Sequence, residues 1–265
     1  MSKYFLVGLV AVVIAAFGAV SYYSPKENPA LNSSLLVETS EAVEITTQDV
    51  TYFENTTGYL ARPAAAEAYP GIVMIHEWWG LNDNIKAMAN QLAQTGYVVL
   101  AVDLYDGQVA QAPERARELS SSLNQERATT NLRQAANYLR TNQQASKVAS
   151  LGWCFGGGQS LQVSLSGEPL DATVIYYGRL TSDKNQLSAI KWPVLGIFGA
   201  EDTSIPVESV NAFQQALNEL GIRNEIHVYP GVGHAFANPS GQSYAPEETR
   251  DAWEKTVSFL DENLK

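Results

Sequence analysis

Short apolar runs alternate with longer amphipathic segments along the chain after residue 43. A continuous apolar run bounded by turn residues is typical of a buried strand, whereas apolar positions three and four residues apart indicate a helix. The first element expected is a polar hairpin from Val43 to Ala61, with its turn near Glu54–Gly58. The strands predicted after it are Gly71–His76, Tyr97–Val102, Val148–Leu151, Ala172–Tyr177, Val194–Phe198 and Glu225–Tyr229.

Helical segments separate these strands. The predicted helices are Asn84–Gln94, a region from Pro113 to Thr141 with a break near Ser122-Leu123-Asn124, the segment after Gly158, Val207–Leu220 and Pro246–Leu264. Strands that alternate with helices predict an α/β fold with a mostly parallel sheet and helices on both faces. Ligands bind beyond the carboxyl ends of the strands in such sheets. Residues that directly follow a predicted strand are therefore the first candidates for a site.

One such position holds Cys154, the only cysteine, in the run Gly152-Trp153-Cys154-Phe155-Gly156. The run joins a predicted strand to a helix and has the form of a nucleophile elbow, with sulfur in place of the usual serine oxygen. Glycines leave room where strand and helix pass close to the nucleophile. The free N–H groups and dipole of the helix N-terminus favour a thiolate there. The alternative interpretation is a small buried structural cysteine.

A nucleophile elbow needs an orienting acid and a histidine, which follow it in that order along the chain. His234 lies in a Gly/Pro-rich loop just after the last predicted strand, whereas His227 lies inside that strand and is interpreted as structural. Asp202 follows the strand Val194–Phe198, with its neighbour Glu201 as the alternative acid. A carboxylate at this place would accept the Nδ1–H of the histidine and fix its tautomer.

Further segments occur in a fixed order around these residues: Ile72-Val73-Met74-Ile75-His76-Glu77-Trp78-Trp79-Gly80-Leu81, Val102-Asp103-Leu104-Tyr105, Tyr176-Tyr177-Gly178, Gly199-Ala200-Glu201-Asp202 and Gly233-His234-Ala235-Phe236. With the elbow, they resemble the dienelactone hydrolase (carboxymethylenebutenolidase-like) family of α/β-hydrolases, from about residue 50 to the C-terminus. The resemblance implies the α/β-hydrolase fold. It also implies a hydrolase of lactones or small activated carboxylic esters, with an acyl-enzyme on Cys154 and a triad completed by Asp202 and His234.

The resemblance adds Glu77 to the catalytic residues. In the family, this glutamate contacts the resting thiol and moves aside as the thiolate forms, and its negative charge would keep the thiol protonated until substrate binds. A salt-bridged glutamate at a strand end is the alternative. The backbone N–H groups of Phe155 and Trp78 would form the oxyanion hole.

The chain departs from the family in the residues that would bind substrate. Family members that act on dienelactone hold its carboxylate with two arginines, one of them four residues after the catalytic histidine, where this chain has Asn238. Losing a bidentate arginine weakens recognition of an anion, so we expect neutral esters and lactones to be the better substrates. Three arginines stay open as substitutes: Arg115, Arg117 and Arg179. Trp78, Trp79 and Tyr105 suggest an aromatic pocket wall, or else plain core packing.

The N-terminus is expected to be separate from this domain. Residues 1–24 hold Lys3 and an uncharged, mostly apolar run over residues 4–20, which is typical of either a signal peptide or a membrane anchor. Residues 25–42 form a polar linker, and the hydrolase domain covers residues 43–265. Both interpretations of the first segment, as a cleaved peptide or as a hydrophobic helix that anchors the chain, predict a domain outside the cytoplasm.

The chain has 28 acidic and 17 basic residues, a net charge of −11, and no basic stripe, which argues against nucleic-acid binding. Its single cysteine rules out an intrachain disulfide. No His/Cys/Asp/Glu cluster has metal-ligand spacing, and we expect no metal, no organic cofactor and a monomer. Two functional hypotheses remain open: the ester or lactone hydrolase, and a non-catalytic relative in which Cys154 is a reactive, redox-sensing thiol.

Overall fold

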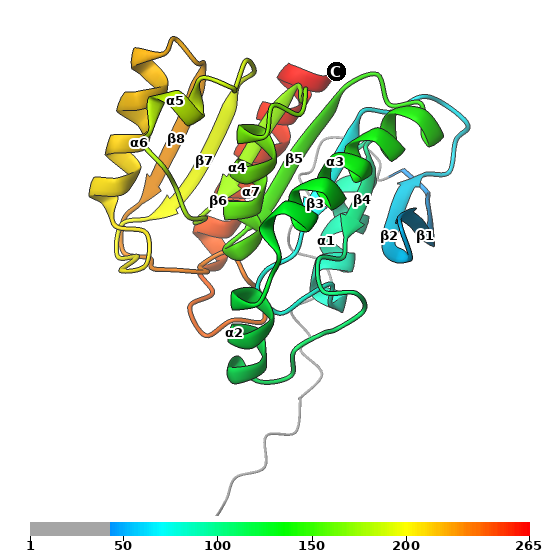
Figure 1. The fold of residues 1–265 in the computed structure, drawn as a ribbon, viewed down its shortest axis with the longest axis horizontal. Coiled ribbons are helices and arrows are strands. Elements are labelled where there is room, and N and C mark those ends of the chain that lie inside the picture. The colour runs from blue at the N-terminus through cyan, green and yellow to red at the C-terminus, as the bar shows by residue number, and fades with distance from the viewer. Residues whose placement is uncertain (1–42) are drawn as a thin grey trace, which may run out of the picture. The chain divides into compact units, whose positions relative to one another are not determined.

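The computed structural model describes residues 43–265, which form one eight-stranded sheet between two layers of helices (Figure 1). The expected signal peptide or anchor, the hydrophobic helix and the linker lie outside the described residues, and they stay predictions. Within the described part, no helix is long and apolar enough to cross a membrane.

The sheet has the strand order β1-β2-β4-β3-β5-β6-β7-β8. Strands β1 and β2 form the predicted antiparallel hairpin, and β2 pairs antiparallel with β4. All other pairs are parallel, which confirms the mostly parallel sheet. The strands are β1 (Ile45–Phe53), β2 (Thr56–Pro63), β3 (Gly71–Ile75), β4 (Val98–Val102), β5 (Val148–Trp153), β6 (Ala172–Tyr176), β7 (Val194–Gly199) and β8 (Asn224–Tyr229).

Alternate residues of each central strand enter different halves of the core. In β3, Val73 and Ile75 pack into one apolar cluster and Ile72 and Met74 into the other. Because side chains of a strand alternate between the two faces, this five-residue buried run needs a helical layer on each side. The face-to-face layers therefore follow from the continuous apolar character of the strand.

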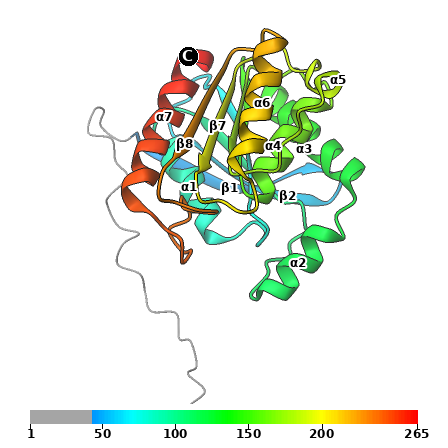
Figure 2. The ribbon, with the colours of Figure 1, turned by 90° about the vertical axis from the view of Figure 1, so that its left-hand side faces the viewer.

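Helices α1 (Asp83–Ala93) and α7 (Pro246–Leu264) cover one face of the sheet. The other face packs against α3 (Gln125–Asn142), α4 (Phe155–Leu165) and α6 (Val207–Glu219), as the turned view in Figure 2 shows. The helix α2 (Pro113–Ser121) precedes α3. The predicted break between them is confirmed, because α3 begins after Asn124, whose side chain accepts the backbone N–H of Arg127 as an N-cap.

One element was not predicted. The helix α5 (Lys184–Leu187) is a single turn between β6 and β7, capped by Asp183. Four residues are too few to show a helical period in the sequence. Elsewhere the differences are at element ends, where β3 stops one residue before His76 and β5 continues to Trp153.

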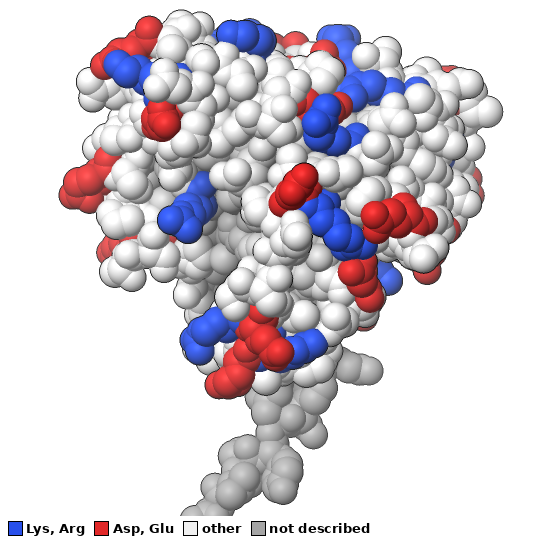
Figure 3. All heavy atoms as spheres, viewed as in Figure 1, with Lys and Arg blue, Asp and Glu red and all other residues white. Residues whose placement is uncertain are grey.

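On the face shown in Figure 3, basic and acidic side chains are interspersed and often adjacent. The ion pairs of the described residues include the contacts of Arg127 with Glu54 and Asp106, and of Lys184 with Glu219.

Candidate active site

Cys154 stands on a strained turn between β5 and α4. Its backbone has φ 54°, a left-handed conformation that side-chain-bearing residues rarely adopt. Two neighbouring glycines make room for the turn. A Cβ atom at Gly152 would lie 2.2 Å from the carbonyl oxygen of Gly156, and a Cβ at Gly156 would lie 2.3 Å from that of Ile75. The predicted nucleophile elbow is therefore present in the backbone, and it presses the first turn of α4 against the end of β3.

The loops after β7 and β8 bring an acid and a base to the sulfur. The Sγ atom of Cys154 lies 3.1 Å from Nε2 of His234, and Nδ1 of His234 lies 2.7 Å from Oδ2 of Asp202. The other carboxylate oxygen of Asp202 accepts the backbone N–H groups of Ser204 (2.7 Å) and Ile205 (3.0 Å). Asp202 is buried while the alternative acid Glu201 is exposed, so the geometry selects Asp202.

The pKa values of Asp202 and His234 are both shifted in the direction that favours the charged form. Burial opposes ionisation of Asp202, but hydrogen bonds from His234, Ile205 and Ser204 hold its pKa below its ordinary value. Burial likewise opposes protonation of His234, but its hydrogen bonds to Asp202 and Cys154 and their charges raise its pKa to about 10. An imidazolium between a carboxylate and a sulfur is the arrangement from which a cysteine attacks a carbonyl carbon.

Glu77 directly follows Ile75-His76 at the end of β3 and is almost fully buried. Burial raises its pKa to about 7, although nearby His234 and a hydrogen bond from Asn238 act in the opposite direction. The side-chain amide of Asn238 donates to Oε2 of Glu77, and its oxygen accepts from the N–H (2.9 Å) and hydroxyl (2.7 Å) of Ser240. The sulfur thus faces His234, while the glutamate expected to contact it is held by Asn238.

Two backbone N–H groups at the carboxyl ends of β3 and β5 have no partner in residues 43–265. Phe155 begins α4 and Trp78 follows Glu77, and neither N–H donates to a protein acceptor in this part of the chain. Free N–H groups at a helix start and beside a nucleophile are suited to bind a developing negative charge.

Aromatic side chains surround this edge of the sheet. The indoles of Trp78 and Trp79 are half-buried and meet edge to face at 5.1 Å, and Tyr105 is buried. Beside Tyr105 lies a cavity of about 260 Å³ between the β4–α2 loop, α2 and α3. The hydroxyls of Tyr105 and Tyr177 are buried and have no hydrogen-bond partner within the described residues.

The three arginines left open by the sequence differ in their surroundings. Arg115 pairs with Glu118 at 2.6 Å and also contacts Gln108. Arg117 and Arg179 are exposed and make no ion pair within residues 43–265. Arg179 follows β6, beside the first turns of α4, since a Cβ at Gly158 would lie 3.6 Å from its Cβ.

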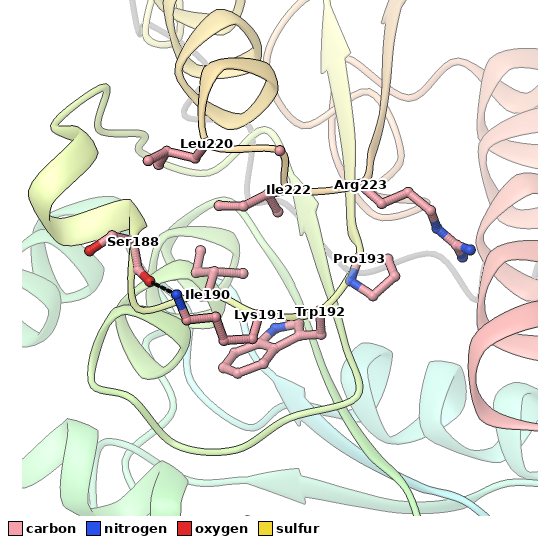
Figure 4. Close-up of a pocket in the computed structure, with 9 residues that line it drawn as sticks. Ser188, Ile190, Lys191, Trp192, Pro193, Leu220, Ile222 and Arg223 are labelled. Carbon is pink, nitrogen blue, oxygen red and sulfur yellow. Dashed lines mark hydrogen bonds between the residues drawn. The ribbon is translucent and has the colours of Figure 1, made fainter.

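A second hollow lies away from this site. A cavity of about 400 Å³ lies at the amino ends of β7 and β8, lined by residues 188, 190–193 and 220–223 (Figure 4). Lys191 bonds the carbonyl of Ser188 there (2.6 Å), and Arg223 pairs with Glu262 (3.4 Å). Since the strands are parallel, this cavity is at the edge of the sheet opposite to Cys154.

Sequence reasoning missed two residues of the site. The sequence assigned neither His76 nor Tyr177 a role beyond membership of a matching segment. Both are fully buried against site residues: the ring of His76 stacks on Phe155 (5.9 Å), and that of Tyr177 meets His234 edge to face (5.2 Å). Two adjacent tyrosines before a glycine were the available signal for Tyr177. The contacts of His76 depend on the register of β3 and β4.

The parallel sheet, the elbow and the edge on which these residues meet define an α/β-hydrolase. The sequence profile of the dienelactone hydrolase family matches residues 56–264. The chain therefore belongs to the dienelactone hydrolase family, and it is a hydrolase of carboxylic esters.

Individual relatives agree with this assignment. The chain is 30% identical over 230 residues to a protein of Saccharolobus solfataricus provisionally named a carboxymethylenebutenolidase, covering 71% of this chain and 88% of the relative. It is 32% identical over 219 residues to Protein usf of Aquifex pyrophilus, covering 78% and 93%. A crystal structure from Klebsiella pneumoniae, described provisionally as a dienelactone hydrolase, has a TM-score of 0.75 and 28% identity, covering 82% and 99%.

Proposed function

We propose that this chain hydrolyses lactones or small activated carboxylic esters through an acyl-enzyme on Cys154, with Asp202 and His234 as its triad partners. The observation that carries the proposal is the pair of contacts Cys154–His234 (3.1 Å) and His234–Asp202 (2.7 Å). Family membership supports the class of substrate. A thiol that only senses oxidants has no use for a histidine oriented by a buried carboxylate, so the redox alternative is disfavoured.

In the first half of the reaction, the Cys154 thiolate, paired with the imidazolium of His234, attacks the carbonyl carbon of the ester. The N–H groups of Trp78 and Phe155 hold the oxyanion of the tetrahedral intermediate. When the intermediate collapses, the C–O bond to the leaving group breaks, and the departing alkoxide takes the proton from His234. A thioester between Cys154 and the acyl group remains.

In the second half, His234 accepts a proton from water as the water oxygen attacks the thioester carbon. The same two N–H groups hold the second oxyanion. Collapse breaks the C–S bond and the carboxylic acid leaves, so that the Cys154 thiolate and the imidazolium of His234 are restored. Asp202 stays ionised throughout and stabilises the imidazolium.

The test is the hydrolysis of p-nitrophenyl acetate and of a panel of lactones by the wild-type protein and its Cys154→Ala variant. We expect the variant to lose at least about 10³-fold in kcat, because the nucleophile is removed. His227→Ala is the control, since His227 lies on β8 outside the triad, and it should retain activity. Turnover by Cys154→Ala close to that of the wild type would refute the acyl-enzyme.

A further inference from the structure

The ring of His76 is fully buried between the ends of β3 and β4. Its Nε2 atom lies 3.2 Å from the backbone N–H of Leu104. A backbone N–H only donates, so Nε2 accepts and carries no proton. The ring proton is then on Nδ1, which lies 2.5 Å from the carbonyl oxygen of Glu77. Burial lowers the pKa of His76, which agrees with a neutral ring that donates from Nδ1.

The carbonyl group that accepts this hydrogen bond is part of the peptide group between Glu77 and Trp78. The C=O of Glu77 and the N–H of Trp78 belong to the same planar peptide group. Fixing the direction of the C=O therefore also fixes the direction of the N–H, which lies in the same plane and points the opposite way. The N–H of Gly80 also donates to this oxygen (3.2 Å), so two donors on one side hold the plane. Hydrogen bonds to a carbonyl also polarise its peptide and make its N–H a better donor.

The same ring touches other parts of the site. It lies nearly parallel to the ring of Phe155, with centroids 5.9 Å apart and an interplanar angle of 16°. On another side it packs against Tyr105 at 4.7 Å. The hydrogen bond that its Nε2 accepts comes from the backbone N–H of Leu104, in the turn that carries Tyr105. His76 thus holds the peptide group whose N–H belongs to Trp78, and its ring stacks on Phe155, the residue that provides the other free N–H.

We propose that His76 is a positioning residue for the oxyanion site, which aims and polarises the N–H of Trp78 through the carbonyl of Glu77. It touches no substrate atom and takes no proton during the reaction. The proposal rests on the proposed function, since it needs an oxyanion at the N–H groups of Trp78 and Phe155.

The test compares two reactions of the same sulfur. Acylation by p-nitrophenyl acetate forms an oxyanion, whereas alkylation by iodoacetamide displaces iodide from a tetrahedral carbon and forms none. Both rates are measured in single turnovers for the wild type, His76→Phe and His76→Gln. Removing an oxyanion donor costs about 10²–10³-fold, and a misaimed donor should cost less. We expect His76→Phe to slow acylation about 10- to 100-fold and to change alkylation by less than about threefold.

His76→Gln keeps both a donor and an acceptor and should recover most of the acylation rate. His227→Phe, the same change in a strand outside the triad, is the matched control and should change neither rate. If His76→Phe slows acylation and alkylation equally, His76 contributes only to packing. If it changes neither rate, His76 has no part in the mechanism. Either result overturns the proposal.

A measurement on the wild-type protein decides the question when His76→Phe does not fold. ¹⁵N NMR of labelled histidine should show a neutral His76 ring between pH 5 and 8, with its proton on Nδ1. A ring that is protonated on Nε2 overturns the proposal. If the wild-type sulfur is alkylated by iodoacetamide but never acylated by esters, the proposed function fails instead, and the tautomer still tests the hydrogen bond on which the positioning depends.

Discussion

The carboxyl group of Glu77 is buried, and it accepts a hydrogen bond from the side-chain amide of Asn238. Burial raises its pKa from an ordinary 4.5 to about 7. The folded protein therefore keeps a proton on Glu77 at pH values where the unfolded chain has released it. Between about pH 4.5 and 7 the folded state binds more protons, so its stability falls as the pH rises through this range.

Glu77→Gln should remove this dependence, because its side chain stays neutral at every pH. We expect the free energy of unfolding of the variant to rise relative to that of wild type between pH 5 and 8, by on the order of 3 kcal/mol at most, and its Tm to rise with it. Thermal unfolding at steps of one pH unit measures it. Glu201→Gln, at an exposed position, is the control and should follow the wild-type curve. Parallel Tm curves for Glu77→Gln and wild type would contradict the buried, protonated carboxyl.

The charge of the preferred substrate is a second prediction at the residue scale. Asn238 stands where a carboxylate-binding arginine is expected, and its amide is already bonded to Glu77 and Ser240. One lost charged hydrogen bond costs about 1.5–3 kcal/mol. We therefore expect kcat/KM for a neutral lactone to exceed that for its carboxylated counterpart by about tenfold or more.

Paired kinetics with Asn238→Arg and Arg179→Ala extend this comparison. The first should improve the anionic lactone selectively. A wild-type enzyme that prefers the anionic lactone, and loses that preference in Arg179→Ala, would show that Arg179 replaces the missing arginine. Arg250→Ala, which removes an exposed charge from α7, controls for the change in net charge.

At the scale of elements, the contact between α4 and β3 places the nucleophile. A Cβ on Gly156 would lie 2.3 Å from the carbonyl oxygen of Ile75, and a backbone atom cannot yield as a flexible side chain does. Gly156→Ala should therefore displace α4 from β3, destabilising the fold by about 2–4 kcal/mol and lowering kcat. Denaturant unfolding measures the first effect and ester hydrolysis the second.

Gly158→Ala is the matched control in the same helix. A Cβ there would meet no atom closer than 3.4 Å, and alanine is favoured over glycine in a helix by about 1 kcal/mol. Its stability should equal or exceed that of wild type. Equal stability of both alanine variants would mean that α4 is not tightly seated on β3.

Most elements were predictable from the sequence because each strand is a short apolar run that ends in a turn signal. The meeting of Cys154, Asp202 and His234 was predictable for the same reason, since each of them follows such a strand. The contacts between neighbouring strand ends were not predictable from the sequence. The pairing of Ile75 with Val102 sets Leu104 beside His76, and Asn238 meets Glu77 across 161 positions of sequence. Such contacts depend on strand order and register, which no local pattern contains.

At the scale of the whole molecule, every residue of the candidate site belongs to the part of the chain between residues 43 and 265. Neither the predicted leader nor the predicted linker contributes a proposed site residue. A protein that starts near Glu41 should therefore fold and hydrolyse p-nitrophenyl acetate with a kcat within about twofold of that of the full chain, since none of the groups that bear on the barrier is removed. Circular dichroism and steady-state kinetics test this, and a truncated protein that is folded but inactive would give the N-terminal residues a part in catalysis.

The strand order β4-β3-β5-β6-β7-β8 has a consequence for how this enzyme comes into being. The sulfur and its base are 80 residues apart, and Cys154, Asp202 and His234 each arrive on a different connection. Distant pairings of this kind close late, because the loop entropy is lost before the contacts form. A nascent chain therefore carries a harmless thiol through most of folding, and its reactivity appears only when the last strand, β8, joins the edge of the sheet. The catalytic reactivity of Cys154 therefore requires the complete sheet.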